Sequence, residues 1–173
     1  MRADDITDYH LARLLILLSY FGRPGSNGLD GLTKLAKLDF LLRYPSFTDR
    51  LLVGRNASWP LGCEPSSDEL KAVESRMIRY KYGPWDNRYY PLLGKLVGCG
   101  LVETVTGRGR IAIRLTGPGA EIADSLARSD EWYVYAGRSE MLSKRFNLTG
   151  NKLKTMIYES LPEAVDLPYW GEI

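Results

Sequence analysis

The chain has 173 residues, of which 45% are apolar and 25% charged, a composition typical of a globular domain. Its net charge is only +2, so charge alone does not favour strong non-specific binding to nucleic acid. Two cysteines and one histidine make neither a disulfide framework nor a metal site, and they exclude most hydrolytic chemistry. We therefore predict no catalytic residues, no metal and no cofactor.

The chain is expected to be cytoplasmic. Its longest apolar run, Leu14 to Leu18, is far shorter than the roughly 20 residues of a membrane span. The N-terminus is acidic, with Asp4, Asp5 and Asp8, where a secretory signal would be basic. We predict neither a membrane segment nor export.

Two helices are predicted at the start of the chain. Residues 8–21 are apolar around most of a helical circumference, which is typical of the centre of a core. RPGSNG follows as a loop. Residues 30–44 then favour an amphipathic helix, capped by Asp30 and ended by Pro45, with a leucine face in the core. The bases expected outside that face are Lys34, Lys37 and Arg43.

The middle of the chain is less regular. A short turn or helix is expected around SFTDRLLV, then a loop rich in Gly, Pro and Ser, then a third helix over 67–80. The stretch YKYGPWDNRYY, residues 80–90, leads into a helix over 86–100.

A hairpin and three helices are predicted next. LVETV and RIAIRL alternate as strands do, and the glycines between them suit a tight turn. Thr116 caps a helix over 117–128, and further helices are expected over 130–146 and 149–161. The fold class is thus mainly α with a small two-stranded β-hairpin, or α+β. The order of elements is that of a winged helix with inserted and C-terminal helices. Residues 1–128 would form the winged-helix domain, with a helical insertion at about 45–85, and residues 129–173 a C-terminal helical extension packed on it.

Two resemblances support this order. LGKLVGCGLVETVTGRGRIAIRLTGPG, residues 93–119, resembles the run in MarR- and PadR-like domains where the recognition helix enters the wing. LTKLAKLDFLLRYP and RYKYGPWDNRYY, taken with that run, resemble the small middle component of bacterial ABC-three-component defence systems, including the Lamassu type. That resemblance implies protein partners, namely an SMC-like ATPase and a nuclease effector.

Basic residues are concentrated in one stretch. Residues 76–114 contain eight bases and two acids, a charge of +6, and the rest of the chain carries −4. The candidate contacts to double-stranded DNA are Arg88, Lys95, Arg108 and Arg110. The arginines at the hairpin tip suit either a phosphate clamp or a solvated turn. Few long polar side chains lie on the preceding helix, which counts against sequence-specific reading.

The aromatic stretch 80–90 has two interpretations. Tyr80, Trp85 and Tyr89 would form a buried corner in most cases, since Gly83-Pro84 turns the chain. Five aromatic residues exceed what one corner needs, so part of the stretch is expected to bind a protein partner. The candidate partner-binding residues are Tyr82, Trp85 and Tyr90, with Tyr82 and Trp85 expected to be exposed.

The sequence and the resemblance together favour a non-enzymatic adaptor subunit of an anti-phage defence complex, which bridges an ATPase and an effector, with contact to DNA through the +6 stretch left open. No small-molecule substrate is expected. The alternatives are a dimeric winged-helix transcriptional regulator, paired through residues 117–161, and an antitoxin-like inhibitor.

Overall fold

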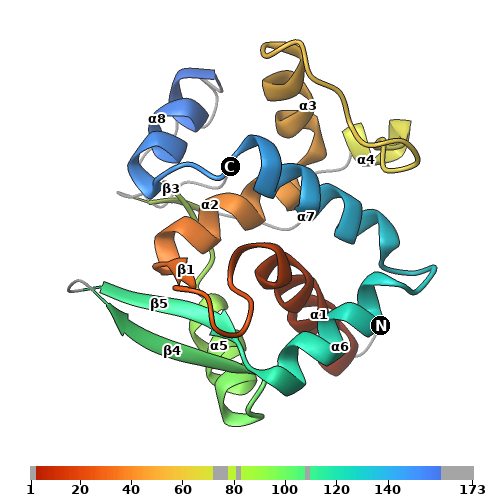
Figure 1. The fold of residues 1–173 in the computed structure, drawn as a ribbon. Coiled ribbons are helices and arrows are strands. Elements are labelled where there is room, and N and C mark those ends of the chain that lie inside the picture. The colour runs from red at the N-terminus through yellow and green to blue at the C-terminus, as the bar shows by residue number, and fades with distance from the viewer. Residues whose placement is uncertain (1–2, 72–77, 81–82, 108–109, 161–173) are drawn as a thin grey trace.

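The computed structural model describes residues 3–71, 78–80, 83–107 and 110–160. It is mostly helical, with a small antiparallel sheet of three strands (Figure 1). The helices are α1 (Ala3–Phe21), α2 (Leu32–Arg43), α3 (Pro45–Val53), α4 (Ser67–Lys71), α5 (Tyr89–Gly98), α6 (Gly117–Ala127), α7 (Tyr133–Arg145) and α8 (Gly150–Ser160). The strands are β1 (Leu29–Asp30), β2 (Ile78–Tyr80), β3 (Gly83–Trp85), β4 (Val102–Gly107) and β5 (Arg110–Leu115).

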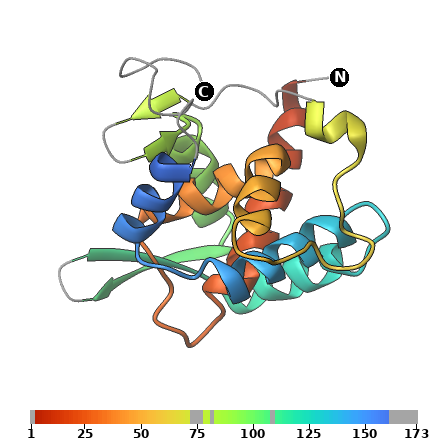
Figure 2. The ribbon, with the colours of Figure 1, turned by 90° about the horizontal axis from the view of Figure 1, so that it is seen from above.

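Helix α1 forms the centre of the core. Its residues Leu14–Leu18 are each no more than 3% exposed, because α6 and α7 both pack along it (Figures 1 and 2). The leucine face of α2 is also buried, as the spacing predicts. The expected position of its bases is wrong for two of them, however. Lys37 and Arg43 are only 2% exposed.

The sheet confirms the predicted hairpin and adds a strand to it. Strands β4 and β5 pair from Val102↔Leu115 to Gly107↔Arg110. The short strand β1 pairs with the other edge of β5, through Leu29↔Ile113 and Asp30↔Ala112, so the order is β1-β5-β4. A two-residue strand gives no alternating pattern, so its sequence predicted only a loop and a helix cap.

The turn from β5 into α6 explains the LTGPG run. The Thr116 side chain accepts a hydrogen bond from the backbone N–H of Gly119 at 3.1 Å, as a helix cap does. A Cβ at position 119 would collide with the carbonyl of Leu101, so only glycine lets the helix approach the preceding segment this closely. The last two predicted helices are confirmed as α7 and α8.

The predicted helix over 67–80 is wrong at its C-terminal end. Its first turn is α4, but residues 78–80 form β2, which pairs with β3 through Arg79↔Pro84. The Gly-Pro pair therefore lies in a strand of a second, two-stranded sheet. Residues 46–53, expected as a short turn or helix, form most of α3.

Candidate interaction surfaces

A network of buried charges joins α1, α2 and the start of α5. At its centre, Arg13 of α1 donates two hydrogen bonds to the carboxylate of Asp39 of α2, at 2.7 and 3.0 Å. The Tyr89 hydroxyl donates to the same carboxylate at 2.7 Å. Burial alone would raise the pKa of Asp39, but the adjacent arginines and this hydroxyl hold it below its usual value. The carboxylate is therefore ionised and fully compensated.

A second carboxylate extends the network toward the surface. Arg43 of α2 donates to Asp86 at 2.9 Å, and Arg88 donates to both oxygens of Asp86, the shortest contact being 2.6 Å. Burial raises the pKa of Asp86, but the hydrogen bonds from Arg88 outweigh this and lower it to about 2. The segment before α5 is thus fixed against α2. We call His10, Arg13, Asp39, Arg43, Asp86, Arg88 and Tyr89 the Arg–Asp network.

His10 lies between two guanidinium groups of this network. Its Nδ1 is 2.6 Å from Arg13 Nη1 and its Nε2 is 2.9 Å from Arg88 Nη1. Burial, followed by the charges of Arg13 and Arg88, lowers the pKa of His10 to about 4. The ring is therefore neutral, with one acceptor nitrogen, and only one guanidinium can donate to it. Arg13 is fixed by Asp39, which favours Nδ1 as the acceptor and leaves Arg88 held by Asp86 instead.

The aromatic stretch forms a buried corner with one exposed ring. Trp85 is 6% exposed and Tyr89 1% exposed, so the corner interpretation is confirmed for both. The expectation that Trp85 is exposed is wrong, because its ring packs edge-on against Tyr89 and its Nε1 donates to Asn87 at 2.9 Å. Tyr90 is 66% exposed and stays available for a partner. Tyr82 lies outside the described residues.

Helix α5 presents a surface without bases at its centre. Tyr90, Gly94 and Val97 are exposed along it at helical spacing, and nothing lies within 4 Å of a Cβ placed at Gly94. The only exposed base on this helix is Lys95, 3.7 Å from Asp8. The face formed by these three residues is mainly apolar.

The candidate DNA contacts whose side chains are described, Arg88 and Lys95, each lie beside a carboxylate. Arg88 binds Asp86 and faces His10. In the same +6 stretch, Arg114 donates to Glu103 at 2.6 Å. Arg108 lies outside the described residues, and Arg110 is placed only as the first residue of β5. Each base of the stretch whose side chain is described therefore has a carboxylate beside it.

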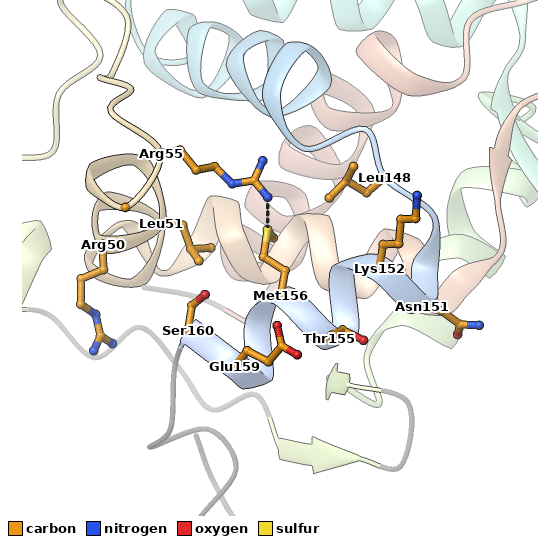
Figure 3. Close-up of a pocket in the computed structure, with 11 residues that line it drawn as sticks. Arg50, Leu51, Arg55, Leu148, Asn151, Lys152, Thr155, Met156, Glu159 and Ser160 are labelled. Carbon is orange, nitrogen blue, oxygen red and sulfur yellow. Dashed lines mark hydrogen bonds between the residues drawn. The ribbon is translucent and has the colours of Figure 1, made fainter.

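Two grooves lie on either side of α3. The first, which we call the basic groove, has a volume of about 650 Å³ and lies between α3 and α8 (Figure 3). Its lining carries three bases and one acid, namely Arg50, Arg55, Lys152 and Glu159. The second, which we call the acidic groove, has a volume of about 570 Å³ and lies between α3 and the loop that follows it. Its lining contains Asp49, Val53, Ala57, Ser58, Trp59, Leu61 and Glu64.

Sequence reasoning missed both the network and the grooves. Arg13, Asp39 and Tyr89 are far apart in sequence, and a charged residue inside a helical pattern is ordinarily assigned to solvent. The grooves depend on how α3 packs against α8 and the loop, which no local pattern encodes. Of the two cysteines, Cys63 is buried and Cys99 is exposed.

The described residues contain no cluster of metal-ligating side chains and no helix long and apolar enough to cross a bilayer. Comparison with protein-family models, with curated proteins and with solved structures gives no match to the chain.

Proposed function

We propose that this chain is a non-enzymatic winged-helix adaptor, which uses the exposed face of α5 to bind another protein. The order α1, β1, α2, α5, β4, β5, with β1 beside β5, is the order of a winged helix and supports this proposal. Residues 45–85 would then be an insertion between its second and third helices.

The observation that carries the proposal is the character of the α5 face. In a winged helix that reads DNA, the third helix enters the major groove and needs several Arg, Asn or Gln side chains there. Here the corresponding face presents Tyr90, Gly94 and Val97. An exposed tyrosine beside open glycine backbone suits close approach by a protein, because tyrosine is enriched at interface hot spots.

The resemblance to ABC-three-component systems names the partners in this proposal, an SMC-like ATPase and a nuclease effector. The chain would hold the two together in an anti-phage defence complex and contribute no catalytic group.

A substitution on α5 tests the proposal directly. Gly94→Glu places a charged side chain in open space and favours the helix, so the fold should remain intact. In cells that co-express the neighbouring gene products, the tagged variant should lose the partners that the wild type retains. Ser125→Glu, an exposed change on α6, should retain them. Retention by the Gly94 variant would contradict the proposed surface.

The β4–β5 hairpin supports a second candidate function, contact with the DNA backbone through Arg108 and Arg110. Replacing both arginines with alanine should weaken duplex binding equally for all sequences and reduce the salt slope by roughly 1–2. A fluorescence anisotropy titration at several salt concentrations measures both. Unchanged binding would exclude the hairpin as a contact.

A further inference from the structure

Helix α3 separates two grooves of opposite charge. The basic groove carries three bases and one acid, a charge of +2, and the acidic groove carries Asp49 and Glu64, a charge of −2. We propose that two copies of this chain form a symmetric dimer along α3, in which the basic groove of each copy faces the acidic groove of the other.

The geometry of a twofold dimer requires one surface that complements itself. The two grooves lie on opposite sides of the same helix. A twofold axis that runs between the copies, along the direction of α3, exchanges these sides. The dimer then contains two equivalent contacts, and in each of them the basic groove of one copy faces the acidic groove of the other.

Arg55 is the clearest unsatisfied charge at this surface. Its guanidinium donates to the thioether of Met156 at 3.2 Å (Figure 3) and to the carbonyl of Arg145 at 3.5 Å. It also lies 5.1 Å from the centre of the Phe146 ring. Among the described residues no carboxylate pairs with it. A carboxylate from a second copy would supply the charge-assisted hydrogen bond that neither neighbour offers.

Glu64 is the matching group on the other side of α3. It is exposed, and no described base forms an ion pair with it. Asp49 is already engaged, because its Oδ1 accepts from Trp59 Nε1 at 2.8 Å. Glu64 is therefore the acid of the acidic groove that is open to Arg55 of a second copy.

Apolar side chains line both grooves along with these charges. Val53 is 67% and Leu61 97% exposed, and both line the acidic groove. Leu51 and Met156 line the basic groove but are only 4% and 9% exposed, so Val53 and Leu61 provide most of the exposed apolar surface. An apolar centre with charges at its edge is the usual construction of a protein interface.

Charge exchange provides a decisive experiment on the full chain. Sedimentation velocity of the wild type should show a concentration-dependent dimer that weakens as salt rises. Arg55→Glu and Glu64→Lys should each weaken dimerisation by roughly tenfold or more, since each creates like-charge contacts.

Mixing the two variants in equal amounts should recover the dimer. The carboxylate introduced at position 55 of one copy then meets the ammonium introduced at position 64 of the other. The second contact of that mixed dimer is the native one, between Arg55 and Glu64. A chain that carries both substitutions should recover the dimer alone, because its two exchanged charges again face each other.

Two control substitutions make the same kinds of charge reversal elsewhere, within residues 117–161. They are Glu121→Lys on α6 and Arg128→Glu at the C-terminal end of that helix, and both should leave the dimer unchanged. Leu61→Asp, at a fully accessible position, should weaken the dimer without altering the thermal melt.

A wild type that stays monomeric up to ~100 μM would overturn the proposal and leave the grooves to another occupant. A dimer that responds to the two control substitutions, or a mixture that fails to recover, would also overturn it. These measurements use the pure protein, so they are independent of the α5 test with partners.

Discussion

The Arg–Asp network and the two grooves beside α3 differ in how their charges are compensated. In the network, Asp39 and Arg43 are almost fully buried, and each carboxylate accepts hydrogen bonds from at least one arginine. In the grooves, Arg55 and Glu64 are exposed and lack an ionic partner among the described residues. Buried ions must be compensated within the fold, whereas exposed ions cost little and can select a partner. The network therefore stabilises the chain's own conformation, and the grooves are suited to recognition.

The largest expected effect comes from removing the central carboxylate of the network. Asp39→Ala leaves the guanidinium of Arg13, at a position 1% exposed, without its carboxylate partner, while the nearby Arg43 keeps only its contact with Asp86. We expect a loss of about 3–5 kcal/mol in the free energy of unfolding, measured by urea denaturation.

Asp124→Ala is the matched control, because its pair with Arg23 is 40–50% exposed on both sides. It should cost less than about 1 kcal/mol. Equal effects of the two substitutions would show that burial does not distinguish these ion pairs.

Removing the buried corner ring should cost nearly as much. Trp85→Ala deletes a side chain that packs against Tyr89 and is 6% exposed, so about 3 kcal/mol should be lost. A thermal melt and a urea titration measure this loss. A melting temperature within a few degrees of the wild type would mean that the ring does not support the fold.

His10 makes the free energy of unfolding depend on pH between about 4 and 6.5. The folded pKa of about 4 lies below the ordinary value of 6.5, so the unfolded chain binds the proton more readily. The contribution of neutral His10 to the free energy of unfolding is complete above about pH 6.5 and is lost as pH falls toward 4, on the order of 3 kcal/mol in total. Asp86, with its pKa near 2 against 3.8, loses its contribution only below that range.

Urea denaturation at several pH values measures this dependence. His10 is the single histidine of the chain, so His10→Gln should flatten the stability profile between pH 4 and 6.5. The fall below pH 4 should persist in the variant. A wild-type profile that is level from about pH 7 to about pH 4.5 would contradict the low pKa.

The secondary-structure elements that the sequence predicts correctly are those whose signal is local in the chain. The helices α1, α2, α5, α6, α7 and α8 and the β4–β5 hairpin have periodic patterns, caps and glycine turns, and sequence reasoning found each of them. It missed β1, which exists only because β5 offers it an edge, and it extended a helix into β2.

The candidate surfaces were less predictable than the fold. Trp85 and Tyr90 are both aromatic and close in sequence, yet one is buried and the other exposed, because Trp85 ends β3, which packs against α2, whereas Tyr90 lies on the exposed face of α5. A sequence pattern assigns both Arg43 and Arg55 to solvent. Arg43 is buried because α2 packs against β3 and the start of α5, whereas Arg55 remains exposed. Composition identified the aromatic stretch, but tertiary contacts decide which ring is accessible.

The smallest expected effect on stability is at that accessible ring. Tyr90 is 66% exposed, and its main described ring contact is the edge-on one with Trp85 at 5.5 Å. Tyr90→Ala should therefore change the free energy of unfolding by roughly 0.5 kcal/mol or less and leave the melting temperature within a few degrees. If α5 binds a partner, the same change should lose about 2 kcal/mol or more of affinity, as hot-spot tyrosines do. Tyr133→Ala, at a 49% exposed tyrosine on α7, is the control for a general loss of aromatic surface. A melt and a pull-down of the co-expressed complex, applied to both variants, separate the two roles. A complex that survives Tyr90→Ala as well as Tyr133→Ala would place the adaptor surface elsewhere than on α5.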